Sequence, residues 1–119
     1  MAKVKILVVE DEAIVARDIK VCLNKIGYEV LGSYSSGEKA LEAIENNQPE
    51  LILMDIMLKG KMSGIDTSVI VKEKYGIPIV FLTAYTDEQT INKAKITEPY
   101  GYIIKPVSYT HLRAHETRH

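Results

Sequence analysis

Short apolar runs that end on polar residues recur along the chain. They lie at residues 4–9, 28–31, 50–57, 77–82 and 100–104. The run from Leu51 to Met54 contains no polar residue, which is typical of a strand buried on both faces of a sheet. We therefore predict a strand at each run, with the run that ends on Asp55 at the centre of a sheet.

Segments with helical spacing of apolar residues separate these runs. The first spans residues 13–26 and stops at Gly27; its apolar residues are Ile14, Val15, Ile19, Cys22, Leu23 and Ile26. The second follows a capping-box pattern at 35–38, and the third runs through Ile65, Val69, Ile70 and Val71 to Tyr75 and Gly76. A fourth, weakly apolar, follows a similar pattern at 86–89. This alternation predicts an α/β fold, a parallel sheet covered by helices on both faces.

The composition is that of one globular domain with a core of its own. The chain has 119 residues, 46% of them hydrophobic, and 15 basic against 16 acidic side chains. A net charge of -1 attracts neither nucleic acid nor an anionic membrane, so we expect no direct binding to either. Cys22 is the single cysteine, predicted to lie in the core, and it excludes an internal disulfide. With no export signal and no apolar run of membrane-spanning length, we expect a cytoplasmic protein.

Chemically active side chains follow four of the predicted strands. Glu10 and Asp11 end the first, Asp55 the third, Thr83 the fourth and Lys105 the fifth. Each has an ordinary explanation as a helix cap, a turn residue or a solvated strand end. Because a parallel sheet brings the carboxyl ends of its strands to one edge, where ligands bind in open α/β sheets, we predict that they form one site.

This set of groups indicates phosphoryl transfer to a carboxylate. Such a transfer needs an attacking acid, a divalent cation and further donors for the phosphoryl oxygens. We predict Asp55 as the nucleophile and Glu10 and Asp11 as ligands of Mg²⁺, which favours carboxylate oxygens and water. Lys105 and the hydroxyl of Thr83 are left to hold the remaining oxygens.

Four motifs in this order give the chain a family resemblance. LVVEDE, LILMDIML, VFLTAY and GYIIKP lie at residues 7–12, 51–58, 80–85 and 101–106. Over residues 3–106 the chain resembles the receiver domain of response regulators in two-component signalling, the CheY-like family. The resemblance implies a flavodoxin-like, doubly wound, five-stranded parallel sheet of order 2-1-3-4-5, the order known for this fold.

The resemblance also implies a role for each site residue. Glu10 and Asp11 match the family's acidic pair, Asp55 its phosphoryl acceptor, Thr83 its switch hydroxyl and Lys105 its invariant lysine. In addition, the backbone carbonyl of Met57 would complete a Mg²⁺ site, with Mn²⁺ as a substitute, and Tyr102 would be the aromatic that responds to Thr83.

The implied partner is a histidine kinase or a phosphotransfer protein. A homodimer through the face of the fourth helix and fifth strand is a further expectation. Apart from phosphorylation by small phosphodonors and slow autodephosphorylation, no enzymatic turnover is expected. The natural protein would be a stand-alone regulator or a part of a longer hybrid protein.

The chain departs from the family pattern in two places. Glu10 stands where many members carry Asp, so we expect it to reach the metal through water. Residues 107–119, where the family has a fifth amphipathic helix, contain all three histidines of the chain and resemble a translated sequencing adapter. We therefore predict a receiver domain over residues 1–106 and an atypical, foreign tail over 107–119.

Three other functions remain to be weighed. The tail matches the H-E-x-x-H zinc-peptidase pattern at 115–119, but no third ligand follows it. A small aspartyl-phosphate phosphatase would carry a second acid two residues after its nucleophile, where this chain has Met57. A receiver-like docking module without phosphorylation would lack an acid or the lysine, and the sequence contains both.

Overall fold

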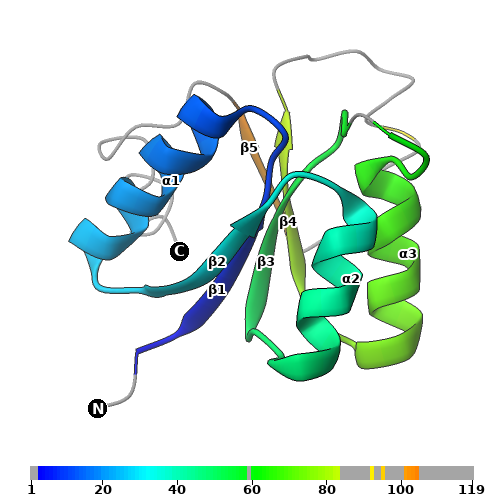
Figure 1. The fold of residues 1–119 in the computed structure, drawn as a ribbon, viewed down its shortest axis with the longest axis horizontal. Helices are drawn as coiled ribbons and strands as arrows, with labels where there is room; N and C mark the ends of the chain where they lie inside the picture. Colours follow the sequence, from blue (N-terminus) through cyan, green and yellow to red (C-terminus); the bar gives the residue numbers. More distant parts are fainter. Residues whose placement is uncertain (1–2, 59, 84–91, 93–94, 96–100, 105–119) are drawn as a thin grey trace.

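A parallel sheet of five strands, in the order β2-β1-β3-β4-β5, forms the centre of the computed structural model (Figure 1). The structure describes residues 3–58, 60–83, 92, 95 and 101–104. The strands are β1 (Lys5–Val9), β2 (Glu29–Tyr34), β3 (Leu51–Asp55), β4 (Ile79–Thr83) and β5 (Gly101–Ile104). The described helices are α1 (Ala13–Ile26), α2 (Gly37–Asn46) and α3 (Gly64–Tyr75). The predicted fold class and strand order are confirmed.

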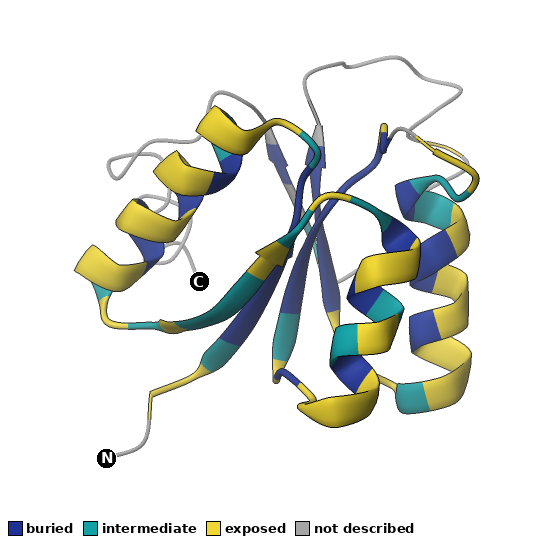
Figure 2. Ribbon diagram, viewed as in Figure 1, coloured by how far each residue is buried: buried dark blue, intermediate teal, exposed yellow. Residues whose placement is uncertain are grey.

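The sheet is covered on both faces, as a doubly wound fold requires. Figure 1 shows α1 on one face and α2 with α3 on the other. Alternate residues of β1 serve the two sides, because successive strand side chains point to opposite faces. Ile6 and Val8 pack with α1, whereas Leu7 and Val9 pack with α2 and α3. In Figure 2, β1, β3 and β4 are dark along most of their length, whereas β2, at the edge of the sheet, has no buried residue. The core therefore lies on both sides of the three inner strands.

Strand β2 is longer than the pattern of apolar residues predicted. The expected strand at 28–31 extends to Tyr34, because Gly32, Ser33 and Tyr34 pair with Leu7, Val8 and Val9 of β1. The sequence Gly-Ser-Tyr has no apolar pattern, so these residues are recruited by hydrogen bonding to a neighbouring strand. The other four strands begin and end within two residues of the predicted runs.

Helix α1 has the predicted bounds and, apart from one residue, the predicted apolar face, with Ile19, Cys22 and Leu23 buried. Gly27 ends it with a left-handed φ of 108°, and its N–H donates to the carbonyls of Leu23 and Asn24. The predicted apolar face included Ile14, which is 77% exposed, and this prediction was wrong. Ala16 is buried on α1 instead, because Ile14 lies on the solvent side of the first turn. Cys22 is buried, as predicted.

Of the two capping boxes predicted, the one before α2 is not formed and the one at 86–89 lies outside the described residues, while α3 has a capping box that was not predicted. At α2, Ser36 accepts a hydrogen bond from the Lys39 N–H at 3.2 Å, but a reciprocal carboxylate contact is not formed at this described helix start. At α3, Ser63 and Asp66 make both bonds of a capping box, and Gly76 ends the helix in the left-handed region.

Helix α3 matches its predicted apolar residues only in part. Val71 is buried and Ile65 packs against the core, as predicted. Val69 and Ile70 are 38% and 37% exposed, whereas the polar residues Thr67 and Ser68 are buried. Their hydroxyls donate to the Ser63 and Ile65 carbonyls, so burying them leaves no hydroxyl proton unsatisfied.

Two predicted elements fall outside the described residues. These are the fourth helix, from 86 onward, and the tail over 107–119. Among the helices that the structure describes, none combines the length and the apolar character of a membrane span.

Candidate functional site

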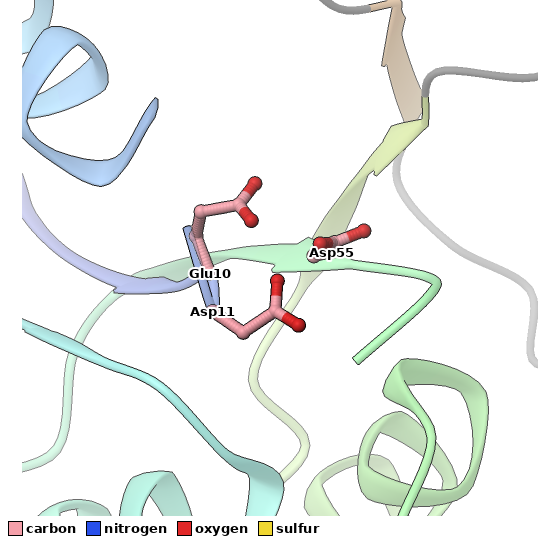
Figure 3. Close-up of side chains that lie close together, drawn as sticks. All are labelled: Glu10, Asp11 and Asp55. Carbon is pink, nitrogen blue, oxygen red and sulfur yellow. The ribbon is translucent and has the colours of Figure 1, made fainter. Parts of the chain in front are cut away.

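Three carboxylates meet at the carboxyl ends of two neighbouring strands. Glu10 and Asp11 follow β1, and Asp55 is the last residue of β3. These strands pair in parallel with Val9 beside Met54, so the residues that come next lie side by side. One carboxylate oxygen from each acid lies within 4.8 Å of the others. Figure 3 shows Glu10 and Asp11 reaching from the end of β1 toward Asp55.

Two of these acids are buried. Glu10 is 2% exposed and Asp55 is 3% exposed, while Asp11 is partly exposed. Carboxylates withdrawn from water lose solvation free energy, which hydrogen bonds or a cation must offset. A cluster of three acids, two of them buried, is therefore unfavourable for an ordinary structural role and favourable for binding a cation.

Backbone donors orient the two buried carboxylates. The Glu12 N–H donates to Oε2 of Glu10 at 3.1 Å, and the Met57 N–H donates to Oδ1 of Asp55 at 3.0 Å. The main chain of Glu10 is held in turn, because its N–H donates to the Tyr34 carbonyl at 2.9 Å. The ends of β1 and β2 and the turn after β3 thus position the acids together.

The donor set suits a hard divalent cation. All three side chains of the cluster offer carboxylate oxygen, the type of ligand that Mg²⁺ and Mn²⁺ prefer. Met57, whose side chain is 56% exposed, lies at the site through its backbone N–H. The metal roles of its carbonyl and of Glu10 through water stay predictions.

The remaining predicted site residues are only partly described. The backbone of Thr83 ends β4, directly after Leu82, which pairs with Asp55. The backbone of Tyr102 pairs with Phe81 in the middle of β5. The side chains of Thr83 and Tyr102, and all of Lys105, lie outside the described residues, so their roles stay predictions.

An open pocket of about 380 Å³ adjoins the acids on the side of β2, and the sequence analysis missed it. Its lining comprises Glu10, Asp11, Ala13, Ala16, Ser33, Tyr34, Ser35 and Lys39. The polar residues that follow the second apolar run, Ser33 to Ser35, could have indicated this pocket, because the carboxyl end of β2 lies at the same edge of the sheet as the acids. On α1 the lining residues are Ala13 and Ala16, whose small side chains leave room for the pocket.

Comparison with known proteins finds one family over nearly the whole chain. The family model of the response regulator receiver domain matches residues 6–116. The transcriptional regulatory protein PdtaR of Mycobacterium tuberculosis is 32% identical over 108 residues, which are 91% of this chain and 52% of that protein. The DNA-binding response regulator MtrA of the same organism is 38% identical over 104 residues, 86% of this chain and 44% of MtrA. The chain thus spans about half the length of these relatives.

Solved structures agree with the sequence comparison. The signal receiver domain of a modulated diguanylate cyclase from Desulfovibrio desulfuricans G20 superposes with a TM-score of 0.87 at 34% identity, covering 95% of this chain and 90% of that one. The chemotaxis protein CheY4 of Vibrio cholerae gives a TM-score of 0.87 at 25% identity, with 98% of each chain covered.

Proposed function

The chain belongs to the response regulator receiver domain family, and we propose that it is the phosphoacceptor module of a two-component phosphorelay. The observation that carries the proposal is the meeting of Glu10, Asp11 and Asp55 at one sheet edge, with Asp55 buried at the end of the central strand. A receiver domain is a signalling module, and its partner here would be a histidine kinase or a phosphotransfer protein.

Asp55 is the residue that we assign to accept the phosphoryl group. Because Oδ1 of Asp55 accepts a hydrogen bond from the Met57 N–H, we assign the attack on phosphorus to Oδ2. The new bond joins Oδ2 to phosphorus, and the bond from phosphorus to the donor's histidine nitrogen breaks. The fixed turn at Asp55 keeps the attacking oxygen oriented, which is the main contribution a protein makes to phosphoryl transfer.

The acidic pair would hold the metal for this step. Mg²⁺, or Mn²⁺ in its place, would neutralise the phosphoryl oxygens when bound to Glu10, Asp11, Asp55 and the Met57 carbonyl. We propose that Lys105 and Thr83 contact the other phosphoryl oxygens. A change at Thr83 would then be relayed to Tyr102, on the neighbouring strand.

The main competing function is that of an aspartyl-phosphate phosphatase. Such an enzyme needs an acid and base beside its nucleophile. The residue two positions after Asp55 is Met57, whose exposed thioether cannot transfer protons and whose backbone N–H binds the nucleophile. Slow autodephosphorylation, not rapid turnover, is therefore the expected behaviour.

The decisive variant is Asp55→Asn. The amide keeps the shape of the side chain but is a poor nucleophile, so phosphorylation by acetyl phosphate with Mg²⁺ should fall below detection. The measurement is the mass of the intact protein after incubation, with Asp18→Asn, an exposed acid on α1, as the matched control. Incorporation of phosphate by Asp55→Asn would contradict the assignment.

A second arm of this experiment addresses the metal and the tail. Deleting residues 111–119 removes every histidine and should leave both phosphorylation and its dependence on Mg²⁺ or Mn²⁺ unchanged. Loss of bound zinc together with loss of activity in the shortened chain would favour the peptidase alternative instead.

A further inference from the structure

Gly64, the first residue of α3, packs directly against the backbone of Asp55. A β-carbon at this position would overlap the Asp55 carbonyl oxygen and lie 2.8 Å from the carbonyl carbon and 3.0 Å from Cα of Ile56. These three atoms belong to the main chain of residues 55–57, the turn that carries the proposed phosphoacceptor Asp55 and is called the acceptor turn below. A larger residue therefore cannot be accommodated by rotating a flexible side chain.

Gly64 differs in this respect from the three described glycines that have a positive φ. Gly27, Gly60 and Gly76 have positive φ values, and an added β-carbon at each would meet nothing within 4 Å. These three glycines are required by backbone conformation. Gly64 lies outside the left-handed region, so its requirement is for space alone.

Hydrogen bonds hold Gly64 in this position. Its N–H donates to the Ile56 carbonyl at 3.1 Å, which ties the start of α3 to the turn after β3. Ser63 caps the helix by accepting from the Asp66 N–H at 3.0 Å. Thr67, itself buried, donates its hydroxyl to the Ser63 carbonyl at 2.8 Å. The helix start is thus fixed against the acceptor strand at several points.

The peptide that Gly64 contacts also sets the direction of the acceptor carboxylate. The Asp55 carbonyl is part of the peptide between Asp55 and Ile56, and the next N–H along the chain, that of Met57, binds Oδ1 of Asp55. Pushing this carbonyl aside would rotate the peptide and displace the Met57 N–H. The carboxylate and the Met57 carbonyl would move with it.

We propose that Gly64 is a positioning residue of the phosphoacceptor site, because only a residue without a β-carbon lets α3 seat on the Asp55 carbonyl and hold the acceptor turn. The part of this proposal that concerns phosphorylation rests on the proposed function. The part that concerns metal binding does not, because the acidic cluster and the contact between Gly64 and the Asp55 carbonyl are both features of the structure.

The test compares Gly64→Ala with Gly27→Ala. Gly27 ends α1 with a φ of 108°, and an added β-carbon there would meet nothing within 4 Å, so the change to alanine strains the backbone without any overlap. Gly27 follows the last turn of α1, whereas the acids precede its first turn, so this control lowers stability without displacing the Asp55 backbone. Both variants are made in the full chain.

Two measurements separate positioning from stability. Mn²⁺ binding, followed by the loss of the free-ion electron paramagnetic resonance signal, should weaken about 10-fold in Gly64→Ala, as expected for groups that orient metal ligands. The phosphorylation rate with acetyl phosphate should fall about 100-fold, because a misplacement of about 1 Å has that effect on an aligned transfer. Gly27→Ala should lower the urea midpoint while its folded form keeps the Mn²⁺ affinity and rate of the original chain.

The outcomes distinguish this inference from the proposed function. If the original chain binds Mn²⁺ but is not phosphorylated, the proposed function is wrong and the Mn²⁺ comparison still decides the role of Gly64. If Gly64→Ala binds Mn²⁺ as the original chain does, or loses affinity only in proportion to unfolding as Gly27→Ala does, the positioning role is overturned.

A second variant covers the case in which Gly64→Ala does not fold. Ser63→Ala keeps Gly64 but removes the side chain that caps α3, so the contact between Gly64 and the Asp55 carbonyl should loosen without any steric overlap. We expect a smaller loss of Mn²⁺ affinity than for Gly64→Ala, at a temperature where circular dichroism shows the variant folded. Unchanged affinity in Ser63→Ala would then overturn the proposal.

Discussion

The two halves of the acidic site are built in different ways, although each is a strand that ends on acid and leads into a helix. In the β1–α1 half, residues 5–26, the helix begins directly after the acids, and its N-cap Glu12 makes no side-chain cap bond. In the β3–α3 half, residues 51–58 and 60–75, a longer turn leads to a capping box and to the close seat of Gly64.

The packing of α1 and α3 against the sheet also differs between the two halves. Helix α1 buries Ile19, Cys22 and Leu23 in an apolar cluster against one face of the sheet. Helix α3 also buries an apolar residue, Val71, but its first turns approach the sheet through the small residues Gly64, Thr67 and Ser68. The hydroxyls of Thr67 and Ser68 donate to the carbonyls of Ser63 and Ile65. Apolar packing is non-directional, whereas hydrogen bonds and close backbone contacts fix position.

This difference matches what the proposed chemistry asks of each half. The β1–α1 half would supply ligands to a metal ion that also binds water, so a small displacement of these ligands can be compensated by movement of the water ligands. The acceptor on the second half must be aligned with phosphorus. The comparison leads us to expect that changes in α1 affect stability, whereas changes in α3 affect stability and chemistry together.

The largest loss of stability is expected from Ile19→Ala, in the β1–α1 half. Ile19 is fully buried, so truncation should lower the free energy of unfolding by about 2–5 kcal/mol. Urea denaturation measures the loss, and Ile19→Val, expected to lose about 0.5–1.5 kcal/mol, is the graded control. The folded fraction should be phosphorylated at the original rate; a slower rate would show that α1 also positions the acceptor.

A smaller loss of stability, with an effect on chemistry, is expected from Thr67→Val. The change removes the hydroxyl that donates to the Ser63 carbonyl and should cost about 0.5–1.5 kcal/mol of unfolding free energy. Because this bond anchors the start of α3, the phosphorylation rate of the folded protein should fall as well. Thr67→Ser, which keeps the hydroxyl, is the control. A Thr67→Val protein with an unchanged rate would remove the distinction between the two halves.

The smallest effect is expected from Ile14→Ser, on the exposed side of α1. Ile14 is 77% exposed, so the free energy of unfolding should change by no more than about 0.5 kcal/mol. Leu23→Ala, at a buried position of the same helix, should cost about 2–5 kcal/mol and calibrates the assay. A loss at Ile14 comparable to that at Leu23 would show that this side of α1 is covered in solution.

Most of the fold was readable from the sequence because its signals are local. Gly27 and Gly76 end their helices as predicted, since a left-handed residue is needed after the last turn. The acids also came together as predicted, because strands that end on Glu10 and Asp55 can only meet at one edge of a parallel sheet. The strand order came from the family resemblance, not from the periodicity.

The errors occurred where burial depends on distant partners. Ile14, Val69 and Ile70 were assigned inward by their apolar character, and the structure leaves them at the surface. Their positions depend on how each helix is rotated about its axis, which is decided by the packing of the whole helix against the sheet. The pocket beside the acids was missed for a related reason, since β2 and α1 form it jointly.

The sequence by itself determined the places of the strands, the helix ends and the acids, because backbone propensity and the alternation of apolar residues act over a few neighbouring positions. Only the tertiary structure decided that α3 packs through Thr67 and Ser68, that Ser33 and Tyr34 join β2, and that Gly64 lies on the Asp55 carbonyl. Each of these depends on a contact with another element or with a preceding turn, and the space left at such a contact is set by close packing of the whole domain.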